Sequence, residues 1–371
     1  MDDLPNSVLF QILSRLGDSA DVARCRVASK ALDTVFPDLR SLHLRSSSKW
    51  YNSSCSQDIK PFKTVFLDLI LKLKSLESVC ISLENPILCN GVPNSDDFNI
   101  IDGDFSKEWL PRVSEPLKSL WISGLPYHRK RQTNFLPLIS VYCHNLVNLK
   151  LNFAWLSVHN LNPMPMLTRL KDPKIHFLNL QTCNLAVYNN PSSLALITPS
   201  LITLTIGSFS PIALHVEAPM LYHFHLDLYA YVHASTLAIQ KFENLKTLWL
   251  NSLYTGSLLF GFPVTKTVET LTLDSGNEAP RDAIDSRLTL RKVFMVYPNV
   301  CSLCIKPNAW SELQAYKIGQ FVGLSEVSLL IHDDVDSTVS EKFMSTCMTG
   351  RPELKWIWGI WSEYKEDSWI I

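Results

Sequence analysis

The chain has 371 residues, of which 46% are hydrophobic and 19% are charged, a composition that can bury a large core and is too apolar for disorder. Its 34 basic and 35 acidic residues give a formal net charge of −1. This near balance argues against a nucleic-acid-binding protein, whose surface is usually basic, and against polybasic attachment to a membrane.

The N-terminus, Met1-Asp2-Asp3-Leu4-Pro5, is acidic and lacks the basic start and apolar core of a signal peptide. No apolar run reaches the roughly 18 residues of a transmembrane helix. The nine cysteines are scattered and odd in number, which favours small buried side chains over a disulfide framework. We therefore expect a soluble intracellular protein of the cytoplasm, the nucleus or both.

Residues 1–36 predict a small all-α domain. Asp3 is placed to cap a first helix, Pro5 suits its first turn, Gly17 suits its end, and Asp18 can cap a second helix. Apolar residues recur at helical spacing along the first helix, at Leu4, Val8, Leu9, Ile12, Leu13 and Leu16. The second helix has its own apolar side, with Val22, Ala23, Val27, Leu32 and Val35. Two short helices bury little surface by themselves, so we expect them to need a partner.

Residues 37–371 contain one recurring pattern: an apolar residue, two variable residues, an apolar residue, one variable residue and a last apolar residue. Twelve copies begin at Leu39, Leu76, Leu117, Leu146, Ile175, Leu201, Leu221, Leu245, Val268, Val300, Leu324 and Leu354, with spacings of 20 to 41 residues. No such unit can bury its apolar face alone, so neighbouring units stack and share a core. The copy Ile175-Leu178-Leu180, followed by Cys183 and Leu185, matches the leucine-rich-repeat pattern most completely.

The repeat predicts an α/β solenoid in which short parallel strands form an arc and helices cover its convex side. The expected helices are Phe62–Leu73, Phe105–Val113, Phe135–Tyr142, Arg281–Val296, Ser311–Phe321 and Ser337–Cys347, and Pro86–Gly103 is the longest expected loop. The register breaks where Leu167 starts a copy that Lys171-Asp172-Pro173 cuts off. Either this segment is an irregular loop, or a unit has been lost from a longer array.

The N-terminal domain resembles an F-box. Leu4-Pro5, Val8-Leu9, Ile12-Leu13 and Leu16 look like its opening, and the segment from Asp21 to Lys30 looks like its second half, with Leu32 in place of the usual tryptophan. With the repeats, the chain is similar to the plant F-box/LRR proteins. The resemblance implies that the F-box helices bind a Skp-family adaptor through Leu4, Pro5, Val8, Leu9, Ile12, Leu13, Leu16, Val27 and Leu32. It also implies recruitment of a protein substrate to a cullin-RING ubiquitin ligase.

Motifs for catalysis and for nucleotide or zinc-protease chemistry are missing: the sequence has no GxxxxGK[ST], GxSxG, HExxH or GxGxxG. Cys301-Ser-Leu-Cys304 has half of a zinc-site spacing, and a structural role for these cysteines is favoured. The acidic run after His332 is typical of a loop, the basic run from His128 to Arg131 is typical of an exposed loop, and the C-terminal tryptophans are typical of a cap. We therefore predict no enzyme, no metal and no cofactor.

Side chains that alternate with the apolar positions are predicted to line the concave face. They include Phe177, Asn179, Trp356 and Trp358, and among them only Lys150 and Glu326 carry a full charge. A polyphosphate cofactor would need clustered Arg and Lys here, which these positions lack. Tryptophan is enriched at interface hot spots, so the candidates for substrate contact are Trp121, Trp249, His223 and His225. Alternatively, the two tryptophans pack flat on neighbouring strands.

Two functions follow from these observations. One is a substrate receptor of a Skp–cullin–F-box ubiquitin ligase, and the other is a repeat scaffold that binds a protein without a ligase. Neither function involves nucleic acid or a membrane.

Overall fold

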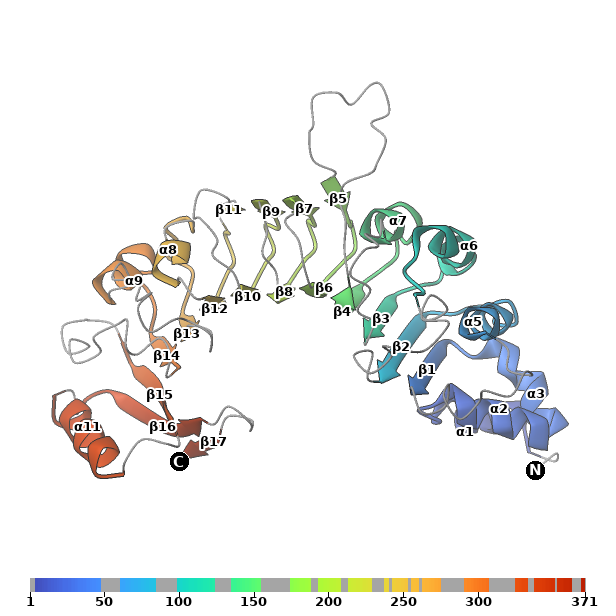
Figure 1. Ribbon diagram of the computed structural model, residues 1–371, viewed down its shortest axis with the longest axis horizontal. Coiled ribbons are helices and arrows are strands. Elements are labelled where there is room, and N and C mark those ends of the chain that lie inside the picture. The colour runs from blue at the N-terminus through green and yellow to red at the C-terminus, as the bar shows by residue number, and fades with distance from the viewer. Residues whose placement is uncertain are drawn as a thin grey trace, which may run out of the picture. The chain divides into compact units, whose positions relative to one another are not determined.

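The computed structural model describes residues 4–47, 61–84, 99–123, 135–154, 174–187, 193–207, 213–228, 237–239, 242–252, 255–259, 262–274, 290–306, 324–332, 337–350, 352–361 and 368–370. The chain divides into two compact units, residues 1–189 with 196–199 and residues 190–195 with 200–371. In each unit, parallel strands follow one another in chain order (Figure 1).

The first unit begins with the N-terminal helical domain, made of α1 (Asn6–Ser14), α2 (Ser19–Ala28), α3 (Lys30–Val35) and the 3₁₀ turn η1 (Phe36–Asp38). Asp18 caps α2 as predicted, because its carboxylate accepts a hydrogen bond from the Ala20 amide at 2.8 Å. The sequence predicted one continuous helix after Gly17, and this prediction is wrong. The backbone of Ser29 is extended and its hydroxyl caps α3, so the segment forms two helices.

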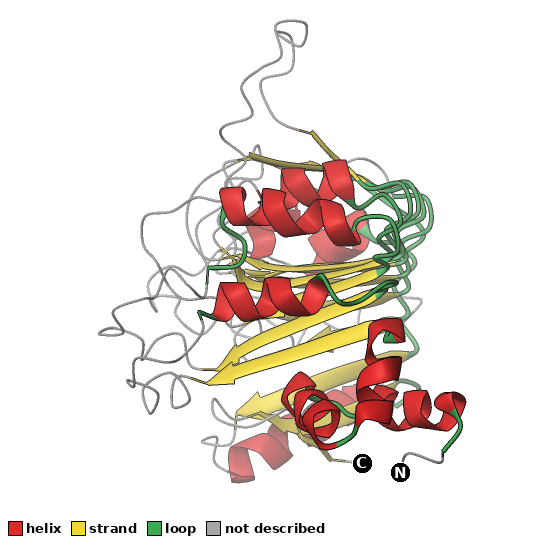
Figure 2. Cartoon of the chain, turned by 90° about the vertical axis from the view of Figure 1, so that its right-hand side faces the viewer, coloured by secondary structure: helices red, strands yellow, loops and turns green. Residues whose placement is uncertain are grey.

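The rest of the first unit alternates strands with helices. Its elements are β1 (Ser41–Ser47), α5 (Phe62–Ile70), β2 (Ser78–Glu84), α6 (Gly103–Val113), β3 (Ser119–Ser123), α7 (Phe135–Tyr142), β4 (Asn148–Ala154), β5 (Lys174–His176) and β6 (Thr182–Val187). Figure 2 shows these helices on one side of the strands and the turns that precede the strands stacked along one edge.

The second unit carries strands with fewer described helices. Its elements are β8 (Thr203–Gly207), β9 (Ala213–Glu217), β10 (His223–Leu228), β11 (Leu237–Ile239), β12 (Thr247–Ser252), α8 (Thr255–Leu259), β13 (Thr270–Asp274), α9 (Leu290–Val296), β14 (Ser302–Ile305), β15 (Glu326–His332), α11 (Ser337–Gly350), β16 (Lys355–Trp361) and β17 (Ser368–Ile370). Strand β7 (Ser193–Ile197) lies where the chain passes between the units. The short strands β9 and β11 pair in parallel with each other. They lie in the segments that connect one long-sheet strand to the next, and each strand with its connecting segment is one coil of the repeat.

Ten of the twelve predicted repeat copies occupy the predicted register. Their middle and last apolar residues pair with the equivalent residues of a neighbouring strand, as Leu42 does with Val79 and Leu248 does with Leu271. The side chains at these positions are buried, and most are 0–2% exposed. The period-2 alternation of a strand places every second side chain in the core, which confirms the solenoid prediction.

The turns before most strands of the large sheet are held by hydrogen bonds to the preceding repeat unit. The amides of Glu77 and Ser78 both donate to the carbonyl of Arg40, at 2.8 and 2.9 Å, and the amides of Lys118 and Ser119 both donate to that of Glu77. The same bonding recurs in the second unit, where the amides of Lys246 and Thr247 reach the carbonyl of Tyr222. These bonds satisfy backbone groups that a turn would otherwise leave unpaired.

Asparagine strengthens this ladder where it precedes the first apolar residue. The side-chain amides of Asn145, Asn179, Asn244 and Asn299 donate to the carbonyls of Glu115, His144, Pro219 and Lys266, at 2.8 to 2.9 Å. Asn179 therefore lies in the turn, and its predicted place on the concave face is wrong.

The copy predicted at Ile175 is also wrong. Ile175 lies in the short strand β5, and Leu178 is 63% exposed. Leu180 opens the true copy, because Cys183 and Leu185 pair with Leu149 and Leu151 of β4. Leu180 satisfies the pattern both as the end of one copy and as the start of the next, and stacking on β4 selects the second frame. As a consequence, Phe177 is buried, and the prediction that it lines the concave face is wrong.

The last copy is shifted as well. Trp356 and Trp358 pair with Val327 and Leu329, the core positions of β15, and Trp358 is only 6% exposed. Their rings lie 5.7 Å apart and nearly parallel. The prediction that they line the concave face is therefore wrong, and they close the core of the last coil, as their interpretation as a cap predicts. Strand β17 then pairs antiparallel with β16.

The described helices agree with four of the six predicted ones. α5, α6, α7 and α11 match, and Phe66, Trp109 and Phe135 bring α5, α6 and α7 together in one aromatic cluster with centroid distances of 5.2 and 6.1 Å. The fifth predicted helix, Arg281–Val296, is described only over α9. The predicted helix 311–321, most of the loop 86–103 and residues 167–173 lie outside the described residues. No described helix is long and apolar enough to cross a membrane.

Loss of a repeat leucine should destabilise the chain. Leu149 and Leu248 are 1% and 0% exposed, so alanine at either position leaves a cavity that costs about 2–5 kcal/mol. We expect reduced soluble expression and a lower midpoint in urea unfolding followed by circular dichroism. Leu178→Ala is the matched control, because its side chain is exposed. Near-wild-type midpoints for both core variants would contradict the repeat assignment.

Candidate functional site

The predicted adaptor-binding residues divide into two groups. Leu9, Leu13 and Leu32 are 1–2% exposed and pack with Val22, Val35, Phe36 and Leu39 in the core of the helical domain. In this structure these three leucines hold α1, α2 and α3 together and are not surface residues. The same apolar spacing that indicates a docking face also describes a helix packing on its own neighbours.

The other predicted residues lie at the surface. Leu4 and Val8 are 39% and 38% exposed, Val27 is 92% exposed, and Pro5 is exposed too. Ile12 and Leu16 are half-buried. We call Leu4, Pro5, Val8 and Val27 the hook surface. Its apolar side chains remain in water although the domain's own core is complete.

The helical domain is anchored to the first strand of the repeat. The amide of His43 in β1 donates to the hydroxyl of Ser19 in α2 at 3.0 Å, and Ser19 is buried. This contact covers part of an exposed strand edge, so the domain also caps the repeat.

The open face of the sheet consists of the side chains that alternate with the buried ones. In the first unit Trp121 stands on this face, 42% exposed, with the Lys150 ammonium 4.2 Å from its ring centroid. Their strands are neighbours, and Trp121 pairs with Lys150 in the register. An exposed indole with a cation on its face is suited to contact with a partner protein.

In the second unit Trp249 is packed on its neighbours. Its ring lies parallel to that of His225 at 4.0 Å, and the Lys306 ammonium is 4.9 Å from its centroid. This arrangement agrees with the alternative that the tryptophan packs flat on a neighbouring strand. Burial, with the nearby Lys306 charge, lowers the pKa of His225 to about 4, so the imidazole is neutral at physiological pH. His223 is exposed and contacts the Tyr222 ring edge-on at 4.7 Å.

A third open-face row, which was not predicted from the sequence, is formed by the residue after the last apolar position of each copy. In the second unit this row holds Asp227, Asn251 and Asp274 on β10, β12 and β13, followed by Lys306 directly after β14. Among the positions predicted for this face only Lys150 and Glu326 are charged, and this row adds Asp227, Asp274 and Lys306. The same alternation of side chains along a strand that predicted the other two rows would have predicted this one. The repeat pattern had only to be extended by one residue beyond its last apolar position.

Asp227 is held in an unfavourable electrostatic position. Its carboxylate accepts a hydrogen bond from the Asn251 amide at 2.9 Å, whereas Lys306 lies 3.9 Å from Asp274. Burial and the charge of Asp274 raise the pKa of Asp227 to about 6, against the smaller effects of Asn251 and Lys306. Among the described residues, Asp227 forms no ion pair within 4 Å.

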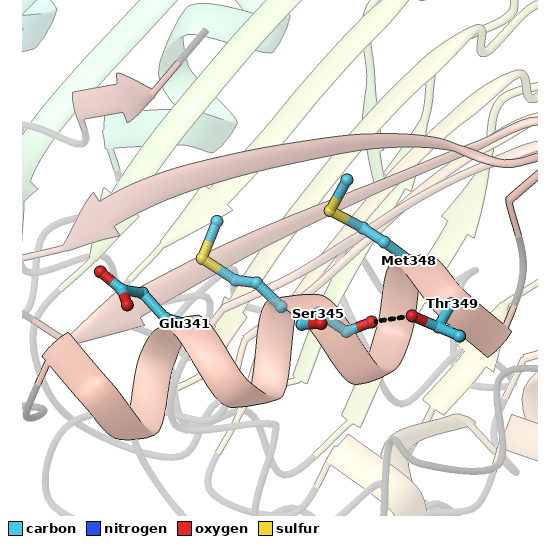
Figure 3. A pocket seen from close by; sticks show the side chains of 5 residues that line it. Glu341, Ser345, Met348 and Thr349 are labelled. Carbon is cyan, nitrogen blue, oxygen red and sulfur yellow. Dashed lines mark hydrogen bonds between the residues drawn. The ribbon is translucent and has the colours of Figure 1, made fainter.

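Other features carry little chemistry. An open groove beside α11 is lined by Glu341, Met344, Ser345, Met348 and Thr349 (Figure 3). Burial raises the pKa of Cys143 and Cys183 to about 12, so these thiols stay protonated and are poor nucleophiles. Among the described residues, no group of three or more His, Cys, Asp or Glu side chains is placed to hold a metal ion. The basic run 128–131 and the acidic residues 333–336 lie outside the described residues.

Comparison with known proteins gives two findings. Residues 1–53 match the F-box-like family model. The whole chain is 30% identical to an F-box/LRR-repeat protein of Arabidopsis thaliana, over 453 aligned positions that span all of both proteins. Because the alignment is longer than the 371 residues of this chain, the relative contains segments that this chain lacks.

Removing the charge of Asp227 should stabilise the chain at neutral pH. Its folded pKa of about 6 lies above the ordinary 3.8, so the folded state loses stability as the pH rises from 3.8 to about 6, and the whole loss is present above that. Asp227→Asn should raise the melting temperature at pH 7.5. This gain should be much smaller at pH 4, where the folded carboxyl holds its proton and the unfolded carboxyl holds it about half of the time. Thermal unfolding at the two pH values measures it. Glu243→Gln, at an exposed carboxylate, should show no such gain. An equal effect of Asp227→Asn at both pH values would refute the explanation.

Proposed function

The chain belongs to the plant F-box/LRR-repeat proteins, and on that basis we propose that it is a non-enzymatic substrate receptor of a Skp–cullin–F-box ubiquitin ligase. The N-terminal helical domain, which includes the hook surface, binds a Skp-family adaptor. The open face of the repeat strands binds a protein substrate. The observation that carries the proposal is the F-box-like match over residues 1–53 in a chain related over its whole length to an F-box/LRR-repeat protein.

Exposed apolar side chains on the helical domain support the adaptor interaction. Val27 is 92% exposed although the core beneath it is complete. Covering such a side chain with a partner contributes about 1.5–3 kcal/mol. Leu4, two residues before α1, and Val8, in its first turn, are also exposed apolar side chains of this domain.

The repeat strands support substrate binding by their geometry. Their buried side chains are committed to the core, so the alternating side chains of the open face are available for contact. Trp121, His223, His225 and Trp249 are the candidates carried over from the sequence, and Trp121 and His223 are the exposed ones.

Charge on the hook surface should abolish adaptor binding. We expect the double variant Val8→Asp/Val27→Asp to lose co-purification with a Skp-family adaptor, because aspartate cannot be buried unpaired in an apolar interface. The thermal unfolding midpoint should stay near that of the wild type, since both side chains are exposed. Leu9→Asp is the contrasting variant and should unfold the domain. If the folded double variant still binds the adaptor, the hook surface is not the docking site.

Substrate capture should depend on the open face. In plant cells treated with a proteasome inhibitor, affinity purification of Trp121→Ala/Trp249→Ala should lose substrate proteins and retain the adaptor and cullin, as measured by quantitative mass spectrometry. Trp121 has the larger expected effect because it is the more exposed of the two. Survival of substrate capture in this variant, with loss when residues 86–103 are replaced, would assign recognition to that loop.

A further inference from the structure

The row formed by Asp227, Asn251, Asp274 and Lys306 is the most strongly polar part of the described open face in the second unit. Asp227 pairs with Asn251, and Asn251 pairs with Asp274, on adjacent parallel strands. The amide of Lys306 donates to the carbonyl of Leu273 at 3.0 Å, which sets this lysine beside Asp274. The four side chains therefore project from successive strands onto one surface.

Positive charge in this row is unevenly distributed. The Lys306 ammonium lies 3.9 Å from the Asp274 carboxylate, and these side chains are only 13% and 15% exposed. The same ammonium lies 4.9 Å from the Trp249 ring, so its position is determined from two sides. Asp227 receives only the neutral amide of Asn251, at 2.9 Å. Within the described part of this row, two carboxylates thus share the Lys306 cation, and the uncompensated negative charge is at Asp227.

The neighbouring groups that the structure describes do not supply the missing charge. His225, two residues before Asp227 on the same strand, stacks on Trp249 and stays neutral because burial and Lys306 lower its pKa to about 4. Further along the sheet, Glu326 pairs with Lys355 at 2.9 Å, so these charges balance each other. The pKa of Asp227, raised to about 6, is consistent with this shortage of positive charge.

We propose that Asp227, with Asn251 beside it and the His225–Trp249 stack along the same strands, binds an arginine or lysine side chain of an extended segment in the protein substrate. The proposal deepens the proposed function and rests on it. Charge complementarity carries it: a guanidinium or ammonium group would pair with Asp227, a carboxylate that forms no ion pair among the described residues.

A metal ion fits this position less well than a side-chain cation. The Asp274 carboxylate is already matched by Lys306, which leaves one carboxylate and one amide for an incoming cation. Calcium takes about 6–8 oxygen ligands and magnesium needs an octahedral set. A single arginine or lysine, by contrast, carries one positive charge, which one carboxylate balances.

Peptide libraries test the site with the full-length chain. Three fluorescent decapeptide libraries would carry Arg, Glu or Ala at position five and uncharged residues elsewhere. At pH 7.5 we expect the immobilised chain to retain the Arg library about tenfold better than the Ala library, and the Glu library least. Asp227→Asn should remove this preference, whereas Glu243→Gln should keep it. The preference should also weaken at pH 5, where Asp227 is protonated.

Other outcomes separate this proposal from the proposed function. Equal retention of the three libraries by the wild type, including no retention of any, would overturn the Asp227 site, as would an Arg preference that survives Asp227→Asn. Adaptor co-purification is measured on the same preparations. If the wild type fails to bind a Skp-family adaptor but keeps an Asp227-dependent preference for Arg, the ligase function fails and the site stands.

Discussion

Parallel pairing of short strands, each with every second side chain buried, is the interaction on which the rest of this structure depends. One coil buries too little apolar surface to compensate for the conformational entropy of ordering its backbone. Stacking supplies the missing contacts: Leu248 pairs with Phe224 on one side and Leu271 on the other, and all three are 0–1% exposed. The turn amides that donate to carbonyls of the preceding coil keep the coils in register.

Functional side chains are therefore confined to surfaces that the stacking of coils does not bury. The core side of each strand admits mainly apolar residues, so chemistry appears on the open face and at the ends of the array. Trp249 illustrates how neighbouring strands restrict even the open face, because His225 covers one part of its ring and Lys306 lies near it. Trp121 and Asp227 remain available, the first because it is exposed and the second because its charge is incompletely matched. The helical domain combines two roles, since Ser19 binds the β1 backbone while Val27 stays in water.

The repeat could be read from the sequence because its period is set by local geometry. Alternation along a strand requires apolar residues two apart, and this pattern placed ten strands correctly. The pattern could not decide where a copy begins when one leucine fits two overlapping copies. Leu178 and Leu180 both satisfy the pattern, and only contact with Leu149 and Leu151 on β4 shows that the frame begins at Leu180. The last copy was predicted one residue out of register, at Ile357 and Gly359, and only the pairing with β15 shows that Trp356 and Trp358 take the core positions.

The sequence by itself therefore determined the class of fold, the order of its parts and the family resemblance, all of which follow from periodicity and local motifs. Tertiary structure decided which apolar residues of the helical domain are core and which are surface: Leu9 and Val8 are neighbours in the chain, yet one is 1% exposed and the other 38%. It also decided the electrostatics of the open face. Asp227 and Asp274 are 47 residues apart in the sequence, and the strand register alone sets them on one row with a single lysine. Charge interactions act through space, so no local pattern in the chain could have revealed which of the two carboxylates pairs with the lysine.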